Sequence, residues 1–184
     1  MKKQENNFAY IDGANVHKGV KELGWKLDYK KLRIWLKDKY GVGRAYLFVG
    51  FISVNSSLYR DLQNWGYTIV FKPTVPNENG EIKGNCDAEL VLQAVSDMYE
   101  RNCEKAVLMT GDGDFACLVQ FLQERGRFAA LISPNHQKAS VLLKRAVFGN
   151  VMFLERLKDR LAYTQKPRNE KAPLRDQPRM GASS

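Results

Sequence analysis

The sequence predicts an α/β fold in which a mainly parallel β-sheet is covered by helices on both faces. Short apolar segments alternate with amphipathic stretches along most of the 184 residues. The apolar segments are nearly continuous hydrophobic runs, which is typical of parallel strands that are buried on both sides. No internal repeat is present, so the pattern indicates one α/β domain.

Six segments are predicted as strands because each is short, apolar and followed by a turn or a polar residue: 8–12, 45–51, 67–72, 105–109, 128–133 and 151–155. Amphipathic helices are expected between them, at about 13–23, 28–40, 55–65, 86–102, 115–126 and 138–147. Their apolar stripes are Leu32, Trp35, Leu36 and Tyr40, then Leu58 and Leu62, then Phe115, Leu118, Val119 and Leu122. Asp28 is placed to cap the second helix. The polar segment 73–85 is expected to form a loop or a small exposed hairpin.

Composition points to a soluble cytoplasmic protein. The chain is 44% hydrophobic and 11% aromatic, as in globular domains, and it has neither a transmembrane run nor a signal peptide. Its three cysteines form no CxxC pair, which suits a reducing compartment. No membrane partner is expected, and a homo-oligomer is compatible with the composition.

The positive charge of the chain is concentrated at its two ends. The net charge is +9, and residues 1–44 hold 11 Lys and Arg against 5 Asp and Glu. From about Lys166 the periodicity disappears and Pro, Arg and Ser become frequent. We therefore expect a folded domain over 1–165 and a basic, disordered tail over 166–184. A basic excess favours nucleic acid as a partner, although a basic surface without any partner is equally compatible with charge alone.

Four aspartates are predicted to meet at one edge of the sheet. Asp12 ends the first strand, while Asp112 and Asp114, in "TGDGDF", follow the fourth. Asp87 opens the long helix, with Leu90 and Val91 three and four residues further on. If the first and fourth strands are neighbours, all four carboxylates share one cleft at the carboxyl ends of the strands, where ligands bind in such sheets.

Each aspartate also has a purely structural alternative. Asp12 suits a turn with Gly13, Asp87 and Asp114 suit helix N-caps, and Asp112 suits a turn. Four ionised carboxylates in one cleft would require a cation, and all-oxygen ligands suit Mg²⁺ or Mn²⁺. Such a site, with one or two ions and an activated water, is able to hydrolyse phosphodiester bonds.

Competing motifs do not match. No GxxxxGK[ST] phosphate loop is present, the GDGD segment lacks the remaining positions of an EF-hand, and the two histidines have no zinc-spaced partners. A haloacid-dehalogenase-like phosphatase would need DxDx[TV] after the first strand, where this chain has Asp-Gly-Ala-Asn. That alternative is the weakest of those considered.

Three motifs in this order, "YIDGANV", "KGNCDAELVLQA" and "TGDGDFACLV", resemble the NYN domain family, the LabA-like branch of the PIN-like nucleases. The resemblance covers about residues 7–157. It implies a three-layer α/β/α domain with strand order 3-2-1-4-5 and a metal-dependent ribonuclease site. The positions that match the family's site are Asp12, Asn15, Asp87, Asp112 and Asp114, and Ser140 falls where members often have a serine. Asn15, Thr110 and Ser140 are given supporting roles, with a helix N-cap as the structural alternative for Asn15.

One departure from the family pattern concerns a further acid in the helix after Asp87. Many members carry one about two turns in, where this chain has Gln93. Glu89 or Asp97 are the possible substitutes, so occupancy by two metal ions is open.

The sequence thus predicts a Mg²⁺- or Mn²⁺-dependent endoribonuclease, with Asp12, Asp87, Asp112 and Asp114 as catalytic and metal-binding residues. Basic side chains around them are candidates for contacts to the RNA backbone: Lys18, Lys21, Lys72, Lys138, Lys144 and Arg145. The alternative is a catalytically weak module of the same fold that binds RNA or a protein.

Overall fold

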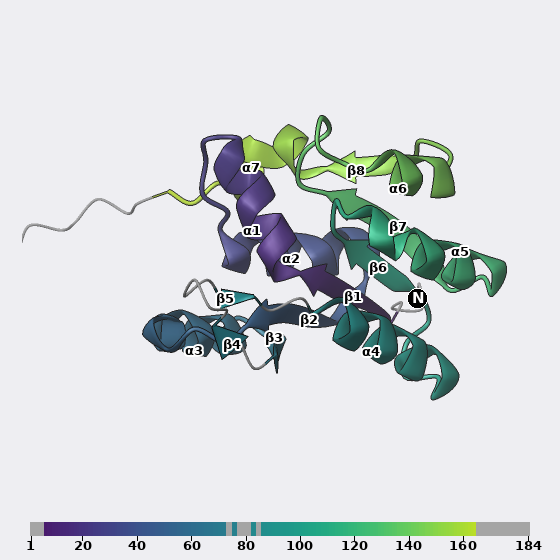
Figure 1. The fold of residues 1–184 in the computed structure, drawn as a ribbon, viewed down its shortest axis with the longest axis horizontal. Helices are drawn as coiled ribbons and strands as arrows, with labels where there is room; N and C mark the ends of the chain where they lie inside the picture. Colours follow the sequence, from purple (N-terminus) through teal and green to yellow (C-terminus); the bar gives the residue numbers. More distant parts are fainter. Residues whose placement is uncertain (1–5, 73–74, 77–81, 84–85, 165–184) are drawn as a thin grey trace, which may run out of the picture.

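The computed structural model describes residues 6–72, 75–76, 82–83 and 86–164. These residues form a six-stranded, all-parallel sheet in the order β3-β2-β1-β6-β7-β8 (Figure 1). The strands are β1 (Asn7–Asp12), β2 (Val42–Gly50), β3 (Tyr67–Lys72), β6 (Ala106–Met109), β7 (Phe128–Ser133) and β8 (Val151–Phe153). The predicted fold class and the predicted order 3-2-1-4-5 are confirmed, and β8 extends the sheet by a sixth strand.

Six helices connect these strands within the described residues, and a seventh, α7, follows β8: α1 (Gly13–Glu22), α2 (Tyr29–Tyr40), α3 (Ser56–Asn64), α4 (Asp87–Tyr99), α5 (Ala116–Glu124), α6 (Val141–Ala146) and α7 (Lys158–Leu161). Short 3₁₀ turns lie at Ser53–Asn55, Gly113–Phe115 and Leu154–Leu157. The predicted cap of α2 is present, because the Asp28 carboxylate accepts a hydrogen bond from the Lys31 amide at 3.0 Å. Helix α7 was not predicted, since a single turn has no periodicity to detect.

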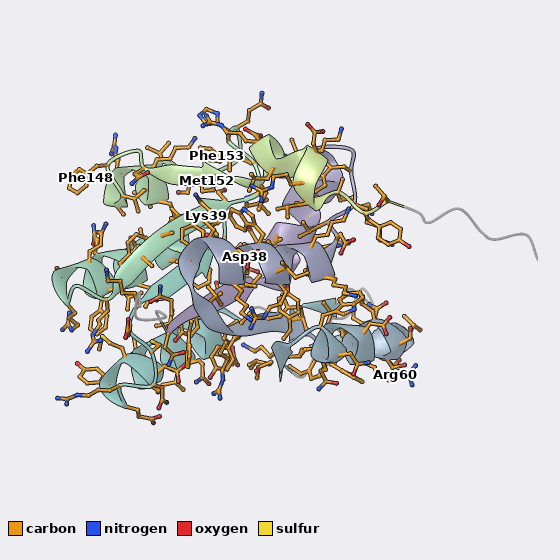
Figure 2. The ribbon with its side chains drawn as sticks, turned by 180° about the vertical axis from the view of Figure 1, so that it is seen from behind. Asp38, Lys39, Arg60, Phe148, Met152 and Phe153 are labelled. Atoms are coloured by element: carbon orange, nitrogen blue, oxygen red, sulfur yellow. The ribbon has the colours of Figure 1, made fainter. Side chains whose placement is uncertain are left out.

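The helices form two layers, one on each face of the sheet. Along β1 the side chains alternate, so that Phe8 and Tyr10 pack in one core while Ala9 and Ile11 pack in the other. Helices α4, α5 and α6 cover the first core, and α1, α2, α3 and α7 cover the second. In the reverse view, Asp38 and Lys39 mark the outer surface of α2 (Figure 2). The protein is therefore an α/β/α sandwich.

Most predicted apolar stripes are buried, but the stripe of α3 differs. Tyr59 and Leu62 are buried, whereas Leu58 is 42% exposed. The Tyr59 hydroxyl accepts a hydrogen bond from the Ile52 amide at 3.1 Å, so this ring fills the interface that Leu58 was expected to fill. The prediction that Leu58 and Leu62 form the buried face was thus wrong for Leu58.

The segment after β3 contains the small hairpin that was one of the two expectations for it. Strand β4 (Val75–Pro76) pairs antiparallel with β5 (Ile82–Lys83). The rest of segment 73–85 and the tail predicted at 166–184 lie outside the described residues. No helix among the described residues is long and apolar enough to cross a membrane.

Helix α1 approaches the sheet closely at its first residue. A Cβ atom on Gly13 would lie 2.5 Å from Val49 Cγ1 and 2.9 Å from the carbonyl oxygen of Phe48. The second contact is with backbone, which cannot rotate away. Gly13 therefore follows Asp12 because the helix needs a residue without a side chain there, and not because a turn needs positive φ.

We expect Gly13→Ala to lower the free energy of unfolding by about 1–3 kcal/mol, the usual cost of overpacking. Gly43→Ala is the matched control on β2, because its new Cβ would meet only the end of the Asn6 side chain. Urea denaturation measures both variants. Equal stability of the two would contradict a steric role for Gly13.

Candidate metal centre

The candidate site lies at the carboxyl ends of β1 and β6. The two strands pair in parallel, with Tyr10 opposite Leu108 and Ile11 opposite Met109. Asp12 is the last residue of β1, and the segment that begins at Thr110 follows β6. The strand order reverses direction between these two strands, which is where open α/β sheets bind ligands.

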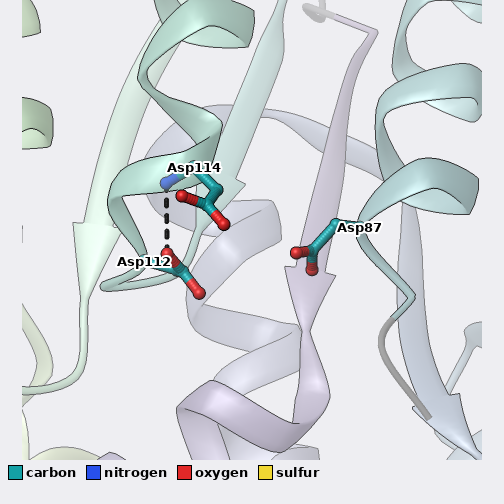
Figure 3. Close-up of side chains that lie close together, drawn as sticks. All are labelled: Asp87, Asp112 and Asp114. Atoms are coloured by element: carbon teal, nitrogen blue, oxygen red, sulfur yellow. Dashed lines mark hydrogen bonds between the residues drawn. The ribbon is translucent and has the colours of Figure 1, made fainter.

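Three carboxylates converge at this edge. Asp87, Asp112 and Asp114 each offer an oxygen atom, and these atoms all lie within 4.8 Å of one another. Figure 3 shows the three side chains around a common space, with Asp87 reaching across from the start of α4. Asp87 and Asp112 are half-buried and Asp114 is exposed. The structure thus brings together three of the four predicted acids.

The structural alternatives explain only part of this arrangement. The Asp112 carboxylate accepts a hydrogen bond from the Asp114 amide at 3.1 Å and caps the 3₁₀ turn Gly113–Phe115. Asp87, in contrast, is already inside α4, whose N-cap position is Cys86. Asp114 lies within the turn that Asp112 caps. Helix capping therefore accounts for Asp112, but not for the convergence of the other two side chains on it.

Asp12 was predicted to be a fourth member of the cluster, but it lies outside the group formed by Asp87, Asp112 and Asp114. Its two oxygens accept hydrogen bonds from the Asn15 amide and the Thr110 hydroxyl, both at 3.1 Å, and it caps α1. Burial raises the pKa of Asp12 above its ordinary value, those two hydrogen bonds lower it, and the charges of Asp87 and Asp112 add to the rise. Asp12 therefore lies within the electrostatic field of the cluster without contributing a ligand atom to the group.

Thr110 connects the two strands of the site through its hydroxyl group. The hydroxyl donates to Asp12 Oδ2 and accepts from the Asp112 amide, at 3.1 Å in each case. The side chain is fully buried. One hydroxyl therefore fixes both the carboxylate that ends β1 and the backbone that carries Asp112.

The other two supporting residues also contact the Thr110–Asp114 segment. Asn15 Oδ1 accepts from the Gly111 amide at 2.8 Å, and the Ser140 amide donates to the Gly111 carbonyl at 3.0 Å. A Cβ atom on Gly113 would lie against the Ser140 side chain, 3.1 Å from its Cβ, so glycine permits the close approach of Ser140 there. Asn15 is not the N-cap of α1, since Asp12 has that position. Whether these residues affect activity stays a prediction.

The proposed substitutes for the missing acid do not enter the cluster. Asp97 is buried and accepts hydrogen bonds from the Tyr10 hydroxyl at 3.0 Å, Gln93 Nε2 at 3.0 Å and Asn102 Nδ2 at 3.1 Å. It lies ten residues after Asp87, about 15 Å along α4. Glu89 pairs with Lys72, with 3.4 Å between Nζ and Oε1. Asp97 is therefore a structural group, and neither residue is a member of the group of three.

A small cavity of about 190 Å³ adjoins the Gly111 side of the site. Asn15 and Gly111 line it, together with Ser133, Lys18 and Lys138. The Ser133 hydroxyl is buried and has no hydrogen-bond partner among the described residues. Ser133 was not among the predicted site residues, although its position at the carboxyl end of β7 places it on the same edge of the sheet.

The six predicted RNA-contacting residues lie in different surroundings. Lys18 is exposed at the rim of this cavity, and Lys138 pairs there with Glu22 at 3.0 Å. Lys144 donates to the His136 carbonyl at 2.8 Å, and Arg145 is exposed. Lys21 is exposed on the side of α1 that faces away from this cavity. Lys72 forms the ion pair with Glu89. Contacts of these residues with RNA stay predictions.

The residues present fit a hard divalent cation. Three carboxylates supply only oxygen atoms, and the mutual repulsion of their charges is relieved when a cation lies among them. The raised pKa of Asp12 is partly a consequence of the same uncompensated charge. Asp87, Asp112 and Asp114 are thus the residues that would hold the ion, directly or through water.

Comparisons with known proteins agree with this geometry. The NYN domain profile matches residues 9–151. A crystal structure of a protein of unknown function, VPA0982 from Vibrio parahaemolyticus RIMD 2210633, superposes with a TM-score of 0.69 at 19% identity. The alignment covers 89% of this chain and 99% of that one. No curated protein matches the sequence.

The NYN domain match places this chain among the PIN-like nucleases, and an α/β/α sandwich with acids at the switch point between β1 and β6 agrees with that class. This chain belongs to the NYN domain family, whose members are generally hydrolases that cleave nucleic acid. The LabA-like branch stays a prediction.

We expect Thr110→Val to lower the free energy of unfolding by about 1–3 kcal/mol, because the partly buried Asp112 amide and Asp12 carboxylate both lose a partner. Thr110→Ser keeps the hydroxyl and should cost about 0.8 kcal/mol or less for one methyl group. Urea denaturation compares the two. An equal loss in both variants would contradict the bridging role of the hydroxyl.

Asp97→Asn is expected to destabilise the fold by about 1–3 kcal/mol, because an amide group would face donors that now share one carboxylate. The affinity of the folded protein for Mn²⁺ should stay unchanged, since Asp97 is remote from the three acids. Calorimetric titration with Mn²⁺, alongside thermal unfolding, separates these effects. Weakened Mn²⁺ binding at full stability would place Asp97 in the metal centre.

Proposed function

We propose that this protein is an endoribonuclease that hydrolyses RNA phosphodiester bonds with Mg²⁺ or Mn²⁺ at the Asp87, Asp112 and Asp114 cluster. The observation that carries the proposal is the convergence of three carboxylate oxygens within 4.8 Å at the switch point of an NYN fold. When bound, the ion would supply an activated water and neutralise charge on the phosphate.

The residues of the chain have separable tasks in this proposal. Asp87, Asp112 and Asp114 hold the ion and thereby fix the place of the scissile phosphate. Asp12 orients the Asp112 backbone through Thr110, and its carboxylate adds negative charge next to the group. To Lys18 and Lys138, at the rim of the cavity beside Gly111, we assign contact with a backbone phosphate. RNA is the proposed substrate, the cytoplasm the proposed location, and a homo-oligomer is compatible with the proposal.

A second candidate function is an RNA-binding or protein-binding module with little catalysis. It is favoured by Gln93, which stands where many family members have an acid. The Gln93 amide donates a hydrogen bond to Asp97 and is not directed at the cluster. The smaller number of acids would weaken binding of a second ion, and catalysis that depends on two ions would suffer most.

We expect Asp112→Asn to abolish RNA cleavage, by a factor of at least about 10³, while the fold persists. The amide can still accept the hydrogen bond from the Asp114 amide, so the cap survives with a loss of at most about 1 kcal/mol. It binds a hard cation far more weakly than a carboxylate. Cleavage of pooled single-stranded RNA with Mg²⁺, Mn²⁺ or EDTA measures the effect.

Glu124→Gln is the control, because it removes an exposed surface charge remote from the cluster. Without metal, the melting temperature of Asp112→Asn should be unchanged or higher, since one of three repelling charges is gone. Cleavage that equals wild type would refute the proposal. Wild-type protein that binds RNA but does not cleave it with either ion would favour the binding module.

A further inference from the structure

A second and larger hollow lies on the other side of α1 from the cavity beside the metal centre. His17, Val20 and Lys21 line this groove, whereas Asn15, Lys18, Gly19 and Glu22 line the cavity. At 3.6 residues per turn the two sets occupy opposite faces of the helix. The groove has a volume of about 1020 Å³ and also includes residues of α2, α3 and the segment after α7. Figure 1 shows how α1 leads away from the tip of β1 toward α7.

Aromatic rings form part of the wall of this groove. Trp25, Trp65 and Tyr163 line it, and Tyr163 is 50% exposed. Trp25 and Trp65 are half-buried and pack against the core beneath α1, α2 and α3. Packing against the core fixes these two rings in place while part of each stays open to the groove. Such rings bind planar ligands at little cost in side-chain entropy.

Lysine side chains accompany the rings. Lys21, Lys26 and Lys30 are exposed along the groove, and Lys26 Nζ lies 4.8 Å above the Tyr163 ring. Two carboxylates, Asp28 and Asp61, also line the groove, but Asp28 caps α2. Lysines therefore outnumber acids, and the groove favours an anionic ligand that also presents flat apolar faces.

Single-stranded nucleic acid has this combination of phosphates and stackable bases. Duplex RNA hides its bases and offers no faces for stacking. A second copy of this chain has a net charge of +9 and would therefore bring positive charge next to the lysines of the groove. The basic segment of the same chain after residue 164 would do so as well. Charge complementarity therefore favours nucleic acid over the two protein occupants, and the exposed aromatic rings favour a single strand over a duplex.

We propose that the groove binds single-stranded RNA by stacking bases on Trp25, Trp65 and Tyr163 while lysines contact the phosphates. This inference rests on the proposed function and makes it more specific, because it assigns unpaired RNA as the substrate. Helix α1, about 15 Å long, joins the two places: its N-cap Asp12 adjoins the acids, and its last two turns line the groove. A strand held in the groove extends around α1 toward the metal centre.

Intrinsic fluorescence provides a direct test, since Trp25 and Trp65 line the groove and the remaining tryptophan, Trp35, is only 5% exposed. In EDTA, so that no cleavage occurs, an oligouridylate of about 12 nucleotides should quench the emission in a saturable manner. Polyphosphate at the same phosphate concentration should not, and a duplex RNA of that length should do so weakly. Equal quenching by all three probes would overturn stacking as the binding mode.

Paired substitutions separate stacking from folding. Trp65→Leu keeps an apolar side chain against the core but lacks a ring, and should weaken oligouridylate binding by about 5- to 150-fold. Trp65→Phe should restore most of the affinity. Lys30→Gln should reduce the slope of log affinity against log salt by about 0.7, while Lys39→Gln, on the same helix but outside the groove, should not. Figure 2 labels this control residue.

The outcomes distinguish this inference from the proposed function. If wild-type protein cleaves RNA and Trp65→Leu binds and cleaves like wild type, the groove inference fails alone. If oligouridylate binds in the groove but no ion supports cleavage, the nuclease proposal fails alone. A change in tryptophan emission with protein concentration in the absence of RNA, abolished by Trp65→Leu, would assign the groove to a protein contact and overturn the inference.

Discussion

The parallel pairing of β1 with β6 is the constraint on which the rest of the site depends. These strands are nearly 100 residues apart in the chain, yet their register places the end of β1 beside the segment that follows Met109. The Thr110 hydroxyl then ties Asp12 to the Asp112 amide across the two strands. Without that pairing, the acids of the first and third motifs would be unrelated surface groups.

Hydrogen bonds from uncharged donors hold two of the carboxylates at this edge of the sheet, those of Asp12 and Asp112. The Asn15 amide and the Thr110 hydroxyl donate to the Asp12 carboxylate, the Asp114 amide donates to the Asp112 carboxylate, and the Asp112 amide donates to the Thr110 hydroxyl. Glycines at 111 and 113 let Asn15 and Ser140 approach this segment closely. The Asp112 carboxylate is therefore held in position before a cation enters the group. Preorganisation of this kind raises affinity without adding contacts.

Much of this arrangement was predictable because strand ends and helix phase are local properties. The strands from Asn7 to Phe153 were recognisable as apolar runs, and the acids at their ends follow from the chain direction. Three outcomes were not predictable. Both oxygens of Asp12 are taken up by Thr110 and Asn15, Asp97 binds the Tyr10 hydroxyl in the core, and Tyr59 replaces Leu58 in the buried face of α3. The bond from Thr110 to Asp12 and that from Tyr10 to Asp97 join residues distant in sequence, and the burial of Tyr59 depends on side-chain shape; periodicity contains no information about either.

The central claim is that Asp87, Asp112 and Asp114 form a divalent-cation site, and Mn²⁺ binding followed by electron paramagnetic resonance tests it most directly. Addition of protein to Mn²⁺ should remove the signal of the free ion with a definite stoichiometry, and excess Mg²⁺ should restore it. Asp87→Asn should weaken this binding strongly, because the carboxylate that reaches across from α4 is then lost. A free-ion signal that protein never diminishes, or the same affinity in Asp87→Asn, would contradict the account.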